Sequence, residues 1–180
     1  MRLTVIDDDM VSVPAHFGAG DSIGGDVHVG VIVYSHTGHT LTVAEKLGEK
    51  LSERGYAITL VELKTVAPLK MGDAIARLRS MPAVDAYDAV VFACPVRGGM
   101  PAPPMRSYLE GLPTLEGKRV ACLVTGVLPA AWGREQTLAQ MAALCEGKGA
   151  TVVGLGSVWW LCLNRRQQTR DVVDHLSSLL

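Results

Sequence analysis

The chain has 180 residues, of which 48% are hydrophobic and 19% are charged, and its formal net charge is -1 at pH 7. This length and composition suit one domain with a sizeable core, and the near-zero charge argues against a nucleic-acid partner. No apolar run reaches transmembrane length and the N-terminus lacks a signal-peptide pattern, so the sequence predicts a cytoplasmic protein without a membrane segment.

Residues 1–26 differ in composition from the rest of the chain. They contain the acidic run Asp7–Asp9 and four glycines, with little sustained periodicity. Two short apolar stretches, 3–6 and 11–13, predict either a small hairpin around the acidic run or a mobile leader. We therefore expect a leader over residues 1–26 and one domain over residues 27–180.

A strand, a polar turn and a helix follow the leader. A β-branched run over residues 27–34 predicts a buried strand, and the apolar stripe of an amphipathic helix follows at Leu41, Ala44, Leu47 and Leu51. The turn between them consists of Ser35, His36, Thr37, Gly38, His39 and Thr40. Unpaired backbone N–H groups, the helix dipole and the hydroxyl donors favour a phosphate there.

Two other readings of this turn are weaker. No lysine follows it, so a nucleotide triphosphatase loop is not indicated. His36 and His39 could be metal ligands, but no carboxylate stands beside them in the chain. We therefore expect loop histidines near a phosphate, and no metal.

Strands and helices alternate from here to the C-terminus. Further strands are predicted at residues 56–63, 89–93, 120–124 and 151–155, the last with an extension through Trp159-Trp160. Continuous apolar strands predict a parallel sheet covered on both faces. Five βα units with right-handed crossovers therefore predict an α/β fold, an open doubly wound five-stranded parallel sheet with helices on both faces.

Four helices complete the predicted units after the first. The second unit has a weak helix at residues 73–79, which ends before Pro82. The third helix opens at Pro103 or Pro104 and the fourth spans residues 135–145. The last helix begins after Asn164, and Gln167 suggests a capping box there.

Ligands of open parallel sheets bind beyond the carboxyl ends of the strands, so the loops after the first, third and fourth strands are the candidate site. The loop after the third strand contributes Pro95, Val96, Arg97, Gly98, Gly99 and Met100, and the one after the fourth contributes Thr125, Gly126 and, further on, Trp132.

Four widely spaced cysteines show no zinc-like spacing and are expected to be structural thiols; a reactive Cys94 is the alternative.

Two of these segments resemble flavodoxins. The positions Ser35, Thr37, Gly38 and Thr40 match the flavodoxin phosphate loop, Thr/Ser-x-Thr-Gly-x-Thr. The segment 95–104 is similar to one subgroup of flavodoxin-like FMN proteins, and the resemblance extends over residues 27–180. It implies FMN as cofactor, with its phosphate on residues 35–40, its isoalloxazine ring against residues 95–100 and its pyrimidine edge near Thr125 and Gly126. Trp132 either covers one face of the ring or packs under its own helix.

The resemblance leaves two functions open. The first is an FMN-dependent oxidoreductase that uses NAD(P)H or a quinone, and the alternative is an electron carrier that docks on redox proteins. Arg97 stands about where flavodoxins carry a stacking aromatic residue, and the net charge is less acidic than is typical of carriers. Both features favour the oxidoreductase. Its partner is then a small electron donor or acceptor, whereas the carrier has a redox protein as partner; the chain forms either a monomer or a homo-oligomer.

Overall fold

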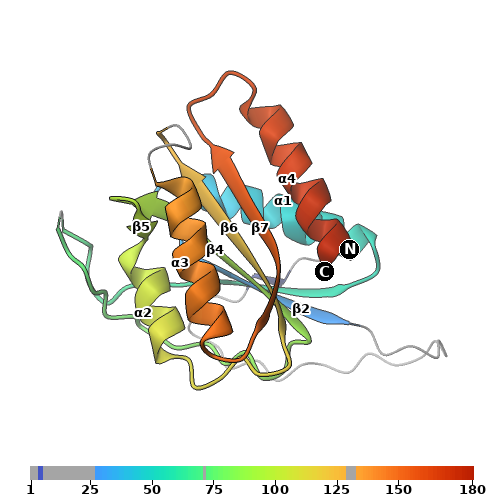
Figure 1. Ribbon diagram of the computed structural model, residues 1–180, viewed down its shortest axis with the longest axis horizontal. Helices are drawn as coiled ribbons and strands as arrows, with labels where there is room; N and C mark the ends of the chain where they lie inside the picture. Colours follow the sequence, from blue (N-terminus) through green and yellow to red (C-terminus); the bar gives the residue numbers. More distant parts are fainter. Residues whose placement is uncertain (1–3, 6–26, 71, 129–132) are drawn as a thin grey trace.

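The computed structural model describes residues 4–5, 27–70, 72–128 and 133–180 (Figure 1). Parallel strands run in the order β1-β3-β2-β4-β6-β7, and a short β5 pairs antiparallel with β4. Their bounds are Thr4–Val5 (β1), His28–Val33 (β2), Ala57–Glu62 (β3), Ala89–Arg97 (β4), Met100–Pro101 (β5), Arg119–Gly126 (β6) and Thr151–Trp159 (β7). The predicted doubly wound sheet of five parallel strands is confirmed, with β1 as a two-residue addition beside β3.

Helices cover both faces of the sheet, as predicted. They are α1 (His39–Glu53), α2 (Pro103–Gly111), α3 (Arg134–Glu146) and α4 (Arg165–Leu179). In Figure 1, α1 lies beside α4 and α2 beside α3. Fully buried side chains join each pair to its own face of the sheet, such as Leu47 and Leu176 on one side and Tyr108 and Met141 on the other. Burial of each large apolar side chain is worth about 1.5–3 kcal/mol, so these two layers hold the fold.

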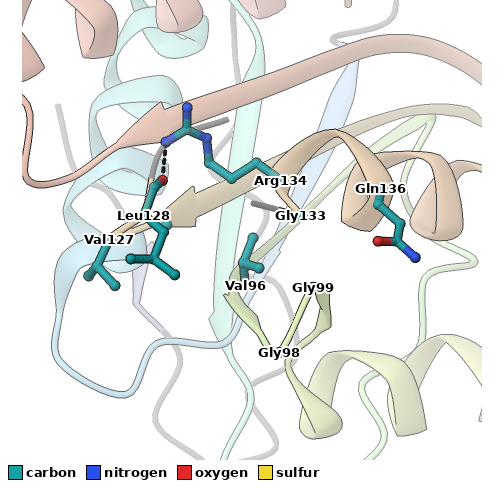
Figure 2. A pocket seen from close by; sticks show the side chains of 9 residues that line it. Val96, Gly98, Gly99, Val127, Leu128, Gly133, Arg134 and Gln136 are labelled. Atoms are coloured by element: carbon teal, nitrogen blue, oxygen red, sulfur yellow. Dashed lines mark hydrogen bonds between the residues drawn. The ribbon is translucent and has the colours of Figure 1, made fainter. Parts of the chain in front are cut away.

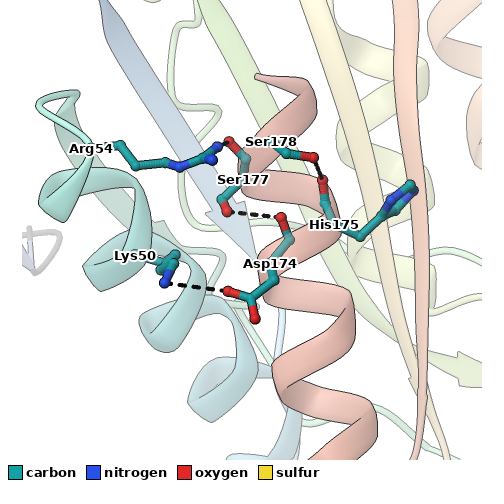
Figure 3. A network of polar contacts seen from close by, with 6 residues as sticks. All are labelled: Lys50, Arg54, Asp174, His175, Ser177 and Ser178. Atoms are coloured by element: carbon teal, nitrogen blue, oxygen red, sulfur yellow. Dashed lines mark hydrogen bonds and ion pairs between the residues drawn. The ribbon is translucent and has the colours of Figure 1, made fainter.

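Polar contacts also join α1 to α4 (Figure 3). Lys50 Nζ lies 3.3 Å from Asp174 Oδ1, and Arg54 donates a hydrogen bond to the carbonyl of Ser177. The ion pair is largely exposed, so it contributes about 0–1 kcal/mol. None of the helices in the described ranges is both long and apolar enough to cross a membrane.

The helix predicted at residues 73–79 is wrong. The described residues of this segment form no helix, and Thr65 pairs antiparallel with Leu78 instead. The backbone N–H of Val66 donates to the Arg77 carbonyl, and that of Arg79 donates to the Lys64 carbonyl. A helix of two turns is marginal on its own, and here the backbone groups find partners across the segment.

Several boundaries also differ from the prediction. The third predicted strand, β4, continues to Arg97 because β5 folds back on it and supplies hydrogen-bond partners, so residues 95–97 lie in a strand and not in a loop. Asn164 is the N-cap of α4 as predicted, but the capping box is wrong. The Asn164 side chain accepts from Gln168, and Gln167 donates to Asp171. The leader hairpin lies outside the described residues, apart from β1.

This topology gathers the candidate loops at one edge. The chain adds β3 on one side of β2 and then β4 on the other, so the strand order reverses between β2 and β4. Open α/β sheets bind ligands at such a reversal, beyond the carboxyl ends of the strands. The segments that follow β2, β4 and β6 meet there.

Candidate functional site

The phosphate turn lies between β2 and α1. His36, Thr37 and Gly38 are exposed, whereas the Oγ of Ser35 is buried and has no hydrogen-bond partner among the described residues. Gly38 is the N-cap of α1, with a φ of 81° that favours glycine. Helix N-termini of this kind bind anions through free backbone N–H groups. The orphaned hydroxyl and the neutral donors therefore fit a phosphate monoester.

Thr40 ties this turn to the end of β6. Its hydroxyl lies 2.7 Å from the hydroxyl of Thr125, and both side chains are buried. The two predicted site residues thus meet through a direct hydrogen bond, although 85 positions separate them. This bond fixes the position of the turn relative to the next loop of the site.

His39 has a different environment from the exposed loop histidine that the sequence suggested. It is the first residue of α1, is partly buried, and stacks on Trp160 with ring centroids 4.0 Å apart. The guanidinium of Arg165 lies 4.4 Å from the centroid of the same indole ring. The histidine therefore links the turn to the segment after β7. Across the described ranges, no group of three His, Cys, Asp or Glu side chains could hold a metal.

A cavity of about 370 Å³ opens between the β4–β5 turn and the segment that joins β6 to α3. Figure 2 shows Val96, Gly98 and Gly99 on one side and Val127, Leu128 and Arg134 on the other. Its lining residues are Val96, Gly98, Gly99, Gly126, Val127, Leu128, Gly133, Arg134 and Gln136. A slot with valine and leucine side chains and glycine backbone in its walls suits a flat heterocycle.

Two glycines bring the walls of this cavity together. Gly133 has a φ of 108°, and a Cβ at that position would lie 2.6 Å from the Cα of Gly99. Only glycine permits both this backbone conformation and this contact. The segments after β4 and β6 therefore touch through their backbones.

Arg134 is the residue of this cavity that sequence reasoning missed. Its side chain runs along one wall toward Leu128 (Figure 2), and the residue is only 6% exposed. The predicted helix began one residue later, which placed Arg134 in a loop, where an arginine is expected to be solvated. Its location after a glycine at the start of a helix beside a candidate loop was the one available signal.

The structure divides the other predicted residues among adjacent cavities. Val96, Gly98, Gly99 and Gly126 line the cavity described above. His36, Thr37, Pro95 and Arg97 line a second one of about 340 Å³. Arg97 and Met100 line a third of about 420 Å³, to which Gly98 also contributes. Trp132 lies outside the described residues.

Cys94 is a structural thiol. Complete burial raises its pKa to about 12, and its Sγ lies 3.7 Å from the Sδ of Met141. The neutral thiol is a poor nucleophile, so the alternative of a reactive Cys94 is wrong. Cys122 and Cys145 are also buried, whereas Cys162 is partly exposed.

Solved structures of flavodoxins resemble this chain. A WrbA-like flavodoxin from Agrobacterium tumefaciens has 16% identity and a TM-score of 0.63, over 86% of this chain and 100% of that one. Flavodoxins from Streptococcus pneumoniae (17% identity, TM-score 0.60, 85% and 99% covered) and Megasphaera elsdenii (18%, 0.58, 82% and 98%) are also similar. At these identities the likeness shows the fold.

A family model adds what the fold alone does not show. No curated protein sequence matches the chain significantly. The model described as NADPH-dependent FMN reductase, however, matches residues 27–160, which contain the phosphate turn and the cavity. The predicted cofactor, FMN, and the predicted class of FMN-binding redox protein agree with this match. The chain is an FMN-binding redox protein and belongs to the NADPH-dependent FMN reductase family.

Proposed function

We propose that this chain is an oxidoreductase that takes electrons from a reduced nicotinamide and passes them through bound FMN to a small acceptor such as a quinone. FMN supplies the hydride and electron chemistry, and the protein supplies binding, orientation and charge. The donor named in the family description supports NADPH as the source of electrons. Four thiols without a disulfide support the predicted cytoplasmic location.

We place the two ends of FMN on different parts of the site. The phosphate lies on residues 35–40, where the orphaned Ser35 hydroxyl and the N-terminus of α1 provide donors. The isoalloxazine ring lies in the 370 Å³ cavity between the β4–β5 turn and α3. The hydrogen bond between Thr40 and Thr125 supports this arrangement, because it holds the two subsites next to each other.

The observation that carries the oxidoreductase proposal is a cavity with two arginines beside the ring cavity. Its volume is about 420 Å³, and its lining includes Arg97, Arg106 and Asp73. Arg106 Nε lies 2.8 Å from Glu110 Oε1, whereas none of the ion pairs among the described residues includes Arg97. Gly98 lines this cavity and the ring cavity, so a ligand bound here lies next to the ring. Guanidinium groups bind phosphate with paired hydrogen bonds. A nicotinamide dinucleotide could thus be held by its phosphates while its nicotinamide reaches FMN.

Substitution of Arg97 tests this role. We expect Arg97→Gln to weaken binding of NADPH by about 10-fold, since a hydrogen bond to a charged group is worth about 1.5–3 kcal/mol. The measurement is the concentration dependence of flavin reduction in anaerobic stopped-flow mixing. Arg119→Gln is the matched control, because Arg119 is exposed at the opposite end of the parallel strands. Equal NADPH dependence in wild type and Arg97→Gln would contradict the assignment of this cavity.

The electron carrier is the second candidate, and one observation favours it. Val127, Leu128, Leu161 and Leu163 expose large parts of their side chains in the segments after β6 and β7. Exposed apolar groups of this kind occur where proteins dock on partners. If neither NADPH nor NADH reduces the bound flavin while a reduced redox protein does, the carrier is the correct function.

A further inference from the structure

Arg134 carries a charge that the described residues leave without an anionic partner. The residue is 6% exposed, and none of the ion pairs among the described residues includes it. Its Nη1 donates to the Leu128 carbonyl over 2.8 Å, but its Nε–H is buried and has no acceptor. Burial of a charge without a counter-charge costs free energy, which a bound anion would recover.

The guanidinium is held in the cavity wall and not directed to solvent. A Cβ at Gly126 would lie 3.0 Å from both Cγ and Cδ of Arg134, so the side chain packs directly on the end of β6. The Trp159 ring lies below the guanidinium, with 5.9 Å between Cζ and the ring centroid. Burial lowers the pKa of Arg134, and the thiol of Cys162 after β7 and the carboxylate of Glu135 on the same helix act against this shift.

The proposed reaction creates negative charge in this cavity. Transfer of one hydride from a nicotinamide to FMN moves two electrons and one proton to the ring and leaves the nicotinamide oxidised. Without a second proton, the ring gains one negative charge, which spreads over its pyrimidine edge. A cation within a few ångströms stabilises such an anion.

We infer that Arg134 is the residue that binds this negative charge and thereby favours the reduced form of FMN over the oxidised form. The inference rests on the proposed function, because it requires the ring in the 370 Å³ cavity. Arg97 is less suited to this role, because it does not line that cavity and its Nη2 donates to the Lys70 carbonyl. Arg134 lines that cavity, and its Nε–H has no hydrogen-bond acceptor among the described residues.

The test compares the affinities of the two redox states in three variants. Arg134→Gln removes the charge, Arg134→Lys retains it, and Arg119→Gln removes an exposed charge at the far end of the strands. Each protein is prepared as FMN holoprotein, and its midpoint potential is measured by anaerobic redox titration with a chemical reductant. Affinity for oxidised FMN is measured separately by titration of the apoprotein.

We expect Arg134→Gln to lose about 10-fold in its preference for reduced over oxidised FMN, which lowers a two-electron potential by about 30 mV. Arg134→Lys should keep most of the wild-type potential, and Arg119→Gln should keep all of it. The pH dependence of the potential gives the number of protons taken up with two electrons. This number should change from one to two at a lower pH in wild type than in Arg134→Gln, because the cation opposes protonation of the reduced ring.

Other outcomes separate this inference from the proposed function. Equal potentials in wild type and Arg134→Gln, or equal losses of affinity for both redox states, would overturn the role of Arg134 even if NADPH reduces the protein. A failure of NADPH to reduce the wild type would overturn the proposed donor, while the chemical titration would still decide the role of Arg134. Absence of FMN binding to the wild type would overturn both.

Discussion

Two side-chain atoms in the described part of the chain are buried without a hydrogen-bond partner, and both lie in the candidate site. They are the Oγ of Ser35 and the Nε of Arg134. A buried donor without a partner costs about 1–3 kcal/mol, so folding alone would not favour either arrangement. A phosphate beside Ser35 and negative charge beside Arg134 would satisfy both atoms.

Ser35→Ala should therefore separate cofactor binding from stability. We expect the affinity of the apoprotein for FMN to fall about 10- to 100-fold, since a hydrogen bond to a charged group is worth about 1.5–3 kcal/mol. The free energy of unfolding of the apoprotein should stay equal or rise, because the variant loses an unsatisfied hydroxyl. Flavin fluorescence titration and urea unfolding measure the two effects.

The control for this substitution is Ser178→Ala, which removes an exposed serine hydroxyl near the end of α4. It should leave FMN affinity unchanged. If Ser35→Ala binds FMN as tightly as wild type, the hydroxyl does not contact the cofactor and the phosphate assignment is wrong.

The local sequence predicted Ser35 as a candidate site residue but gave no such prediction for Arg134. Ser35 belongs to a short pattern of hydroxyl residues and glycine between a strand and a helix. Such a pattern predicts an anion site from the local sequence alone. The burial of Arg134 depends on its approach to Gly126 and Trp159. Because Trp159 is distant in the chain, no local pattern could show that this arginine is enclosed.

Among the contacts between elements, that between the β4–β5 turn and the start of α3 leaves no room for a side chain. We expect Gly133→Ala to lower both the free energy of unfolding and the affinity for FMN, because its Cβ would lie 2.6 Å from the Gly99 Cα and force the cavity walls apart. Gly117→Ala is the matched control. Gly117 has a φ of 73° but no atom within 4 Å of the added Cβ.

The control variant carries only the cost of a left-handed backbone, about 1–2 kcal/mol. Urea unfolding and FMN titration of both variants measure the difference. Equal destabilisation with unchanged FMN affinity in Gly133→Ala would show that the contact between the two glycines does not shape the cavity.

The sequence predicted the strands with buried side chains correctly, and it failed for a segment whose side chains are mostly exposed. The central strands β2, β4 and β6 are continuous apolar runs, and their side chains are almost entirely buried. The failed helix at residues 73–79 has mostly exposed or partly exposed side chains, with Ile75 at 79%. This segment has little apolar surface to bury. Its backbone therefore pairs with residues 64–66 and does not follow the helical periodicity of its own sequence.

At the scale of the whole molecule, chain order alone predicted which segments the fold brings together at the candidate site. Alternating units and right-handed crossovers placed the segments after β2, β4 and β6 at one edge, and the structure joins two of them through Thr40 and Thr125. The subdivision of that edge into three cavities was not predictable, because it depends on side-chain packing. The separation of Arg97 from the ring cavity is the main consequence.

The central claim is that FMN bound to this chain accepts a hydride from a reduced nicotinamide. Anaerobic titration of the FMN holoprotein with NADPH, followed by flavin absorbance, tests it most directly. We predict that about one NADPH per FMN bleaches the oxidised flavin spectrum and that added quinone restores it. Retention of the oxidised spectrum in the presence of excess NADPH or NADH, in protein that a chemical reductant does bleach, would contradict the claim.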